Sequence, residues 1–195
     1  MTMVRERGAP APVDVEVPAD VLALWAETEP AVLKYPDPRL RKPAKPNGRP
    51  CRETRALAER MKAAMVRANG IGLSAPQIGV SERVIVYRLL DENSQVRTIV
   101  NPKIVSRKGE QIGLEGCLSL PMLHGDVKRA QEIVVKGVDL AGRPLRRRAT
   151  DLEARVIQHE MDHLDGVLFI DRAEPGTLHW SLPGDENGED EDPVP

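Results

Sequence analysis

The amino-acid sequence predicts an α+β fold, in which antiparallel sheets pack around a central helix that carries a His-Glu-x-x-His motif. The sheets are indicated by pairs of strand-like segments rich in β-branched and apolar residues. These pairs are residues 83–90 with 96–100 and residues 132–140 with 143–149. Turn-forming residues separate the members of each pair, at 91–94 and at Ala141-Gly142. The central helix is predicted to begin after Thr150, because apolar residues recur there with helical spacing.

Length and composition are those of a single globular domain. The chain has 195 residues, of which 41% are hydrophobic and 30% charged. Aromatic residues make up only 3%, so the core is expected to be mainly aliphatic. No apolar run approaches the roughly 18 residues that cross a membrane, and the charged N-terminus lacks the apolar segment of a secretory signal. We therefore expect a cytoplasmic protein with no membrane partner, whose Cys51 and Cys117 stay reduced.

The two ends of the chain differ in composition from its centre. Residues 1–30 are rich in proline, alanine and charge, and are expected to be a poorly ordered extension with a short helical turn within 21–33. Residues 31–175 are expected to form the folded domain. Residues 176–195 are expected to be a disordered tail, because 185–195 holds six acidic residues and no basic one. Deleting this tail is expected to leave activity nearly intact.

A loop, a helix and a glycine-rich stretch are predicted before the first strand pair. Residues 34–50 contain five prolines, which favour an extended surface loop. Residues 52–68 are predicted to form an amphipathic helix that ends at Asn69-Gly70. Its apolar stripe consists of Leu57, Met61, Ala64, Met65 and Ala68. The stretch 70–79 is crowded with glycine and small side chains, which fits either a close backbone approach or a tightly packed turn.

The helix that follows Thr150 carries the most informative motif. Thr150 and Glu153 form a capping-box pattern at its start. His159 and His163 lie about 40° apart around the helix axis, so both imidazoles can reach one metal ion. Glu160 lies between them, where its carboxylate can approach a water on that ion. The motif therefore predicts a metal-dependent hydrolase with two ligands and a general base.

A third ligand must come from elsewhere in the chain. Downstream, Glu174 and His179 are candidates, although neither sits in a convincing motif. Upstream, Cys117 lies in the stretch 115–121, whose glycine and proline constrain the backbone. Metal coordination would hold its side chain as a thiolate. The residues alone leave both alternatives open, and a downstream ligand would indicate a zincin-type metallopeptidase.

Three stretches taken together resemble the peptide deformylase family. That family carries, in this order, a Gly-x-Gly-x-Ala-Ala-x-Gln loop, a Glu-Gly-Cys-Leu-Ser stretch and a Gln-His-Glu-x-Asp-His stretch. Here they stand at residues 70–77, 115–119 and 158–163. The resemblance covers about residues 34–172 and so lies within the expected catalytic domain. Ser74 stands where the family most often has alanine, and we expect this change to have little effect.

The resemblance implies removal of the N-formyl group from the N-terminal formyl-methionine of newly synthesised polypeptides, with release of formate. The metal ligands would be Cys117, His159 and His163. Glu160 would be the general acid/base for a metal-bound water that attacks the formyl carbonyl. The side-chain amide of Gln77 and the backbone N–H of Leu118 would stabilise the oxyanion. One divalent ion per chain is implied, Fe2+ first, with Zn2+, Ni2+ or Co2+ as alternatives.

The resemblance also implies that substrate binds as an extended strand beside glycine-rich backbone. Ile71, Gly72 and Gly116 would lie along that strand. Leu152 and Val156 would line the methionine pocket with Ile71, and plain core packing is the alternative for them. The implied partners are nascent formyl-methionine peptides and, transiently, the ribosome, and the enzyme is expected to be a monomer. A catalytically inactive, deformylase-like binding protein is the remaining alternative.

Several residues near the motifs carry weaker expectations. Arg129 is expected to brace the Cys117 stretch through Glu115. His124 is expected to be structural or exposed, with a place at the rim of the cleft as the alternative. Cys51, at the start of the first long helix, is expected to be a surface or packing thiol.

Overall fold

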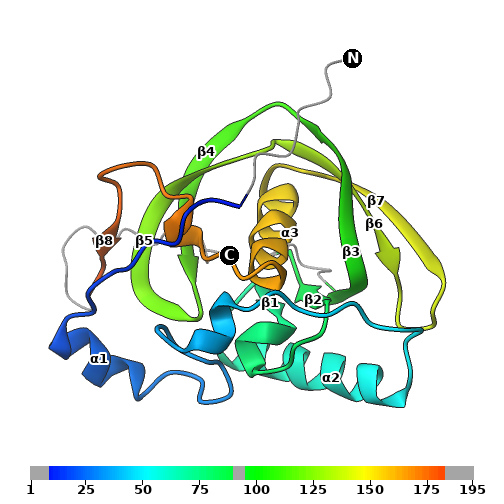
Figure 1. The fold of residues 1–195 in the computed structure, drawn as a ribbon, viewed down its shortest axis with the longest axis horizontal. Helices are drawn as coiled ribbons and strands as arrows, with labels where there is room; N and C mark the ends of the chain where they lie inside the picture. Colours follow the sequence, from blue (N-terminus) through cyan, green and yellow to red (C-terminus); the bar gives the residue numbers. More distant parts are fainter. Residues whose placement is uncertain (1–8, 90–94, 183–195) are drawn as a thin grey trace.

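The computed structural model describes residues 9–89 and 95–182 of the chain, in which two antiparallel sheets flank a central helix, α3 (Asp151–Leu164) (Figure 1). The five-stranded sheet contains, in spatial order, β1 (Gly72–Ser74), β2 (Val84–Tyr87), β3 (Arg97–Lys108), β6 (Glu132–Val138) and β7 (Pro144–Thr150). The three-stranded sheet contains β4 (Gln111–Cys117), β5 (Leu120–Arg129) and β8 (His179–Trp180). The predicted α+β fold is confirmed.

Both predicted strand pairs are present. In the first, β2 runs antiparallel to β3, with Tyr87 opposite Arg97. In the second, β6 runs antiparallel to β7, with Glu132 opposite Thr150. The predicted turn at 91–94 lies outside the described residues. Strand β3 continues well beyond the predicted segment and pairs with β6, which joins the two hairpins into one sheet.

The two predicted strand pairs do not include the long hairpin of β4 and β5. In the structure the two strands pair from Gln111 opposite Arg129 to Cys117 opposite Leu120. Glycines obscure the strand pattern here, and each makes room for a neighbouring side chain. A Cβ at Gly113 would lie 3.0 Å from the Arg155 guanidinium. The hairpin brings Cys117, at the end of β4, next to His163 of α3.

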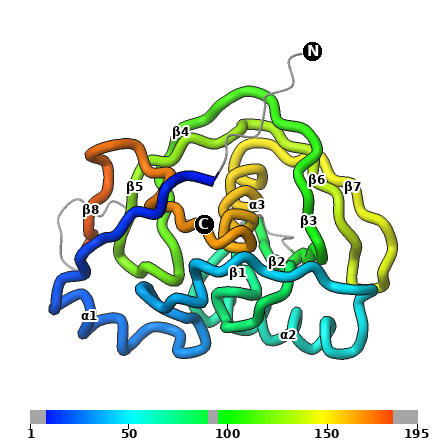
Figure 2. The backbone as a smooth tube through the Cα atoms, in the orientation of Figure 1, coloured from blue at the N-terminus to red at the C-terminus, as the bar shows by residue number. Residues whose placement is uncertain are grey.

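Helix α3 is buried from residue 153 to residue 164 and lies between the two sheets (Figure 2). The predicted capping box at its start is wrong. Thr150 is the N-cap residue but its side chain makes no capping hydrogen bond. The Glu153 carboxylate instead accepts a hydrogen bond of 2.9 Å from the Tyr87 hydroxyl and pairs with Arg147. Because this carboxylate is buried among those partners, it is drawn away from the helix N-terminus.

Helix α2 (Arg52–Arg67) forms as predicted and covers one side of β1 and β2 (Figure 2). Its buried stripe includes Leu57, Met61 and Met65. The proline-rich stretch 34–50 is mainly irregular, as predicted, with one 3-10 turn at Pro38–Arg41. No helix among the described residues combines the length and the apolar character needed to cross a membrane.

The N-terminal segment corrects an expectation. Residues 9–30 do not form a poorly ordered extension but pack onto the three-stranded sheet through α1 (Ala19–Trp25). The Trp25 indole N–H donates to the Pro121 carbonyl at 3.0 Å, and its ring centroid lies 6.3 Å from that of Trp180. Apolar side chains spaced along an otherwise polar segment supply this burial. The expected helical turn is α1, and residues 1–8 lie outside the described residues.

The C-terminal segment also corrects an expectation. Residues 176–182 are not a disordered tail, because β8 pairs with β5, with His179 opposite His124 and Trp180 opposite Leu123. Leu178 packs against Gly125, where an added Cβ would lie 2.8 Å from a Leu178 methyl carbon. The acidic part of the tail, 183–195, lies outside the described residues.

Truncation is expected to separate these two parts of the C-terminus. Deleting 176–195 should lower the free energy of unfolding by about 2–5 kcal/mol, since burying a large apolar side chain such as Leu178 or Trp180 contributes about 1.5–3 kcal/mol. Deleting only 183–195 retains every contact described above and serves as the matched control. Urea unfolding of both truncated chains checks this. Equal stability of the two would contradict a structural role for β8.

Candidate metal centre and active-site cavity

Three candidate ligands meet where the end of β4 faces α3. The ligand atoms of Cys117, His159 and His163 all lie within 4.8 Å of one another, and all three residues are buried. Cys117 Sγ lies 3.3 Å from His163 Nε2. The two imidazoles are nearly perpendicular, with centroids 5.0 Å apart. Within the described ranges this is the one cluster of at least three His, Cys, Asp or Glu residues that could hold an ion.

This donor set fits a divalent transition metal. One thiolate and two imidazoles suit zinc, iron, cobalt or nickel. His159 Nδ1 lies 3.0 Å from Glu115 Oε2, so Nε2 would be the atom that binds a metal ion. His163 Nε2 faces Cys117, while its Nδ1 has no hydrogen-bond partner among the described residues. Three protein ligands with one open position are typical of catalytic rather than structural sites.

The surroundings favour the ligating form of the cysteine. Burial alone would raise the pKa of the Cys117 thiol, but the imidazoles of His163 and His159 outweigh it and hold that pKa well below its usual value. Burial alone would lower the pKa of His159, yet Cys117 and Glu115 raise it to about 10. The thiolate is the form that binds metals, so the protein presents it ready for coordination.

Glu115 orients His159 and is itself held by arginines. Arg129 donates to both Glu115 oxygens, at 2.9 and 2.8 Å, and Arg155 donates to Oε1 at 2.8 Å. Burial opposes the charged carboxylate, but Arg129 and His159 outweigh it and keep the pKa of Glu115 far below its usual range. The expected bracing of the Cys117 stretch by Arg129 through Glu115 is therefore present.

The same network extends to residues that the sequence reasoning missed. Arg129 also pairs with Asp162, which in turn binds Arg172 at 2.6 and 2.7 Å. Asp162 and Arg155 lie seven positions apart on α3, and therefore on one face of it. A recurrence of charge on one face of an otherwise buried helix is the signal that could have revealed them.

Replacing Arg129 with methionine is expected to lower the free energy of unfolding by about 3–5 kcal/mol, because Glu115 and Asp162 would each lose a buried ionic partner. Metal affinity should fall about 10–100-fold, since Glu115 would hold His159 less firmly. Chemical unfolding and a chelator competition measure the two effects. Arg148→Met is the matched control, because Arg148 is exposed and pairs with Glu132 at the surface. A loss of stability as small as that of the control would refute this assignment.

Glu160 lies beside the ligands and is 1% exposed. Burial raises the pKa of its carboxyl to about 7, although the imidazoles of His159 and His163 oppose this. Its Oε2 has no hydrogen-bond partner in the described residues. A Cβ at Gly72 would collide with Oε1, so only glycine allows β1 to pass this close to the carboxylate. The arrangement leaves a buried carboxylate beside Gly72 with one oxygen that has no hydrogen-bond partner among the described residues.

Gln77 approaches the centre from the glycine-rich stretch. Its Oε1 accepts hydrogen bonds from the Ser74 backbone N–H at 2.8 Å and from the Ser74 hydroxyl at 2.9 Å. These bonds turn the amide so that Nε2 lies 3.5 Å from Cys117 Sγ and 3.3 Å from Ser119 Oγ. The hydroxyl of Ser74 thus adds a second hydrogen bond that orients the amide.

The expected substrate-binding residues fall into two groups. Ile71 and Val156 are fully buried in the core cluster beneath the five-stranded sheet. Gly72 lies in β1, which is an edge strand of that sheet, so one side of its backbone is open to another strand. Leu152 is 38% exposed at the start of α3, so core packing does not account for it.

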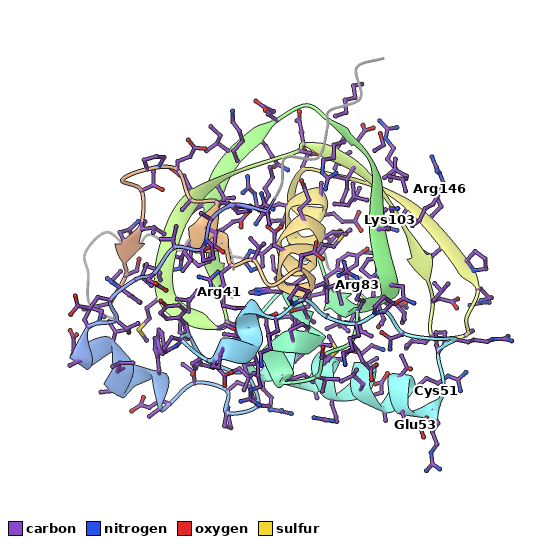
Figure 3. The ribbon with its side chains drawn as sticks, in the orientation of Figure 1. Arg41, Cys51, Glu53, Arg83, Lys103 and Arg146 are labelled. Carbon is purple, nitrogen blue, oxygen red and sulfur yellow. The ribbon has the colours of Figure 1, made fainter. Side chains whose placement is uncertain are left out.

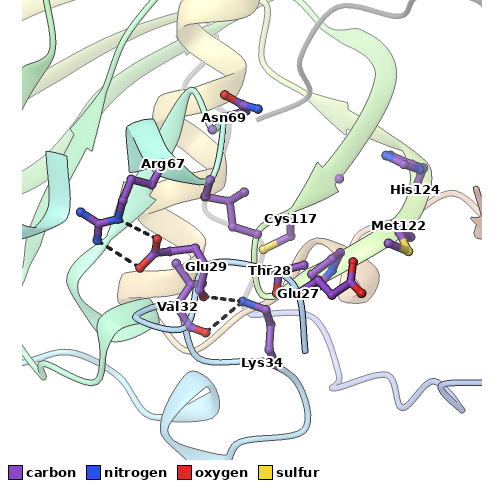
Figure 4. A pocket seen from close by; sticks show the side chains of 15 residues that line it. Glu27, Thr28, Glu29, Val32, Lys34, Arg67, Asn69, Cys117, Met122 and His124 are labelled. Atoms are coloured by element: carbon purple, nitrogen blue, oxygen red, sulfur yellow. Dashed lines mark hydrogen bonds and ion pairs between the residues drawn. The ribbon is translucent and has the colours of Figure 1, made fainter. Parts of the chain in front are cut away.

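An open cavity of about 460 Å³ lies over Cys117 (Figure 4). Gly116, Cys117 and Leu118 form part of its floor, so the cavity and the metal centre are continuous. Leu118 also packs on Gly70, where an added Cβ would lie 2.7 Å from a Leu118 methyl carbon. His124 lines the cavity as well, which places it at the rim.

The fold and the site together define a metal-dependent hydrolase. The family model described as polypeptide deformylase matches residues 30–178. The chain is 46% identical to the peptide deformylase of Alkalilimnicola ehrlichii over 141 residues, covering 72% of this chain and 79% of that one. It is 42% identical to the peptide deformylase of Thermomicrobium roseum over 161 residues, covering 80% of this chain and 92% of that one.

Solved structures agree with these relatives. The crystal structure of a peptide deformylase from Synechococcus elongatus in complex with actinonin is similar with a TM-score of 0.72 and 43% identity, covering 74% of this chain and 80% of that chain. A peptide deformylase from Legionella pneumophila is similar with a TM-score of 0.71 and 42% identity, covering 74% and 85%. The chain belongs to the peptide deformylase family. It is an enzyme that uses a divalent metal to remove the N-formyl group from polypeptides.

Proposed function

We propose that Cys117, His159 and His163 hold the catalytic metal ion and that Glu160 is the general acid/base. The observation that carries this proposal is the meeting of Cys117 with the His-Glu-x-x-His helix, with three ligand atoms within 4.8 Å. Gln77 is placed to assist, because its Nε2 points at the same centre. Among the described residues the cluster includes neither downstream candidate, Glu174 or His179, which supports Cys117 as the third ligand.

The reaction breaks the C–N bond of a formamide and adds water, which yields formate and a free amino group. A divalent metal at this site supplies Lewis-acid activation of a water molecule and of the formyl oxygen. Glu160 accepts a proton from the attacking water and passes it to the departing amine. Gln77 Nε2 and the Leu118 backbone N–H donate to the formyl oxygen as its negative charge develops. Burial of Glu160 keeps bulk water from competing for its proton.

The substrate is proposed to bind as an extended strand on the open edge of β1. Backbone at Ile71 and Gly72 would pair with it, and Gly116 would flank it on the other side. A Cβ at Gly116 would lie 2.9 Å from the His124 ring, which supports the need for glycine there. Leu152 and Val156, with Ile71, are proposed to form the pocket for the methionine side chain, and the exposure of Leu152 supports this.

Ferrous iron is the ion proposed for the site, by family resemblance, and Zn2+, Ni2+ and Co2+ share its donor preferences. The proposed substrate is the formyl-methionine end of a nascent chain, which implies transient association with the ribosome in the cytoplasm. The enzyme is proposed to act as a monomer. Every proposed site residue lies within 31–175, which supports this range as the catalytic domain.

Formate release from a formyl-methionine peptide tests the proposal, with protein purified without oxygen and its metal content measured in parallel. Oxygen exclusion matters because a thiolate-ligated ferrous site is open to oxidation. We expect formate release in proportion to bound metal. Fully metallated protein that releases no formate would support the alternative of an inactive, deformylase-like binding protein.

A further inference from the structure

The cavity over Cys117 has a wall that lies outside the region matched by the family model. That region begins at residue 30, whereas Glu27, Thr28 and Glu29 line the cavity. The rest of the lining includes Met122 and His124 of β5 and Arg67 at the end of α2. The segment between α1 and residue 30 therefore shapes the space next to the metal centre.

This wall is fixed at both ends. On one side, Trp25 donates to the Pro121 carbonyl at 3.0 Å and contacts Trp180. On the other side, the Arg67 guanidinium binds both oxygens of Glu29, at 2.8 and 3.1 Å. The wall thus joins the three-stranded sheet to α2 and is a defined part of the cavity.

Of the charged side chains that line the cavity, some have hydrogen-bond or ion-pair partners in the described part of the chain and one carboxylate does not. Glu29 is paired with Arg67. The Lys34 ammonium is half-buried, donates to the carbonyls of Glu29 and Val32 at 3.2 and 3.0 Å, and lies within electrostatic reach of Cys117 (Figure 4). The exposed carboxylate of Glu27 has no cationic partner among the described residues. It is drawn near Met122, away from Arg67 (Figure 4).

The substrate can enter this cavity in only one direction. The formyl group is the end of the substrate, so the part of the peptide that extends from Cys117 into the cavity consists of the residues that follow the formylated amine. The proposed methionine pocket is on the α3 side, and neither Leu152 nor Val156 lines this cavity. The cavity is therefore available to the residues that follow methionine.

We propose that Glu27 forms a subsite for a basic side chain in the first residues after formyl-methionine, so that the N-terminal segment determines selectivity for lysine or arginine there. This rests on the proposed function. A partly exposed ion pair changes binding by roughly two- to fivefold, which is the preference expected in kcat/KM. Because such a pair is screened by ions, the preference should fall as salt is raised.

The test uses the metal-loaded full chain and formyl-Met tripeptides with Lys, Gln or Glu at each of the two positions after methionine. In the unmodified enzyme, kcat/KM should be highest for Lys and lowest for Glu at one of these positions. Glu27→Gln should remove most of this order, and Glu27→Lys should reverse it. Bound metal per chain and the urea unfolding midpoint should stay at the values of the unmodified enzyme in both variants, which shows that they fold and that their metal centre is intact.

Glu16→Gln is the matched control, since Glu16 is an exposed acid of the same segment outside the cavity. It should keep the preference of the unmodified enzyme. A Lys preference that survives Glu27→Lys, or equal kcat/KM for all peptides, would overturn the subsite while leaving the deformylase reaction in place. No formate release from any peptide would remove the proposed function and the subsite with it.

Discussion

Replacing Glu160 with glutamine is expected to lower kcat for formate release by about 10²–10⁴-fold, the usual contribution of a general acid/base. The substitution keeps the size of the side chain but removes its ability to accept a proton from water. Metal content should stay at the level of the unmodified enzyme, because Glu160 lies beside the ligand cluster and is not a member of it. The measurement is formate release per bound metal ion under substrate saturation.

The stability of this variant separates chemistry from folding. Glu160 is buried without a partner for Oε2, so a neutral amide should not reduce the free energy of unfolding. Glu59→Gln is the matched control, because Glu59 is an exposed acid of α2 that pairs with Lys62. It should leave kcat unchanged. Formate release by Glu160→Gln at the rate of this control would contradict the assignment of Glu160 as the general base.

Replacing Cys117 with alanine is expected to abolish stable metal binding. Loss of an outer partner of a ligand typically costs about 10–100-fold in affinity, so loss of a thiolate ligand should cost more than that. The two remaining imidazoles sit on adjacent turns of α3 and cannot enclose the ion by themselves. Metal content after dialysis and chelator competition check the loss, and formate release should disappear with the metal.

Cys51→Ala is the matched control for this variant. Cys51 is the second free cysteine and is exposed at the start of α2 (Figure 3). It contacts Thr54 rather than any ligand. It should bind metal and release formate as the unmodified chain does. If Cys117→Ala kept its metal, the zincin-type alternative with Glu174 or His179 as third ligand would be favoured instead.

Local patterns predicted much of this fold because they depend on neighbours in the chain. The spacing of Leu57, Met61 and Met65 predicted α2, and turn residues at Ala141-Gly142 predicted the hairpin of β6 and β7. The same kind of reasoning failed at Thr150, because a pattern of capping residues does not show that Glu153 will find Tyr87 and Arg147 instead. The buried hydrogen bond with Tyr87, from a strand distant in sequence, and the ion pair with Arg147 replaced the local capping interaction.

The N-terminal segment shows the same limit of local patterns, because here the composition underestimated the order of the chain. Its proline and charge predicted poor order, yet Val21 and Trp25 are buried against the three-stranded sheet. A few apolar side chains are enough when a complementary surface exists, and only the folded chain reveals that surface. The cavity wall at Glu27 follows from this packing and could not have been read from composition.

The sequence by itself determined that His159 and His163 share one face of a helix, because 3.6 residues per turn bring positions four apart together in any α-helix. It also placed Glu160 between them, within the same turn. Through the family motifs, it also indicated Cys117 and Gln77 as their partners. The tertiary structure alone decided that Cys117 Sγ stands 3.3 Å from His163 and that Arg129 joins Glu115 to Asp162, whereas the bracing of the Cys117 stretch by Arg129 through Glu115 was already expected from the sequence. These residues are distant in sequence, and their meeting depends on how two sheets fold around α3, which helical spacing does not determine.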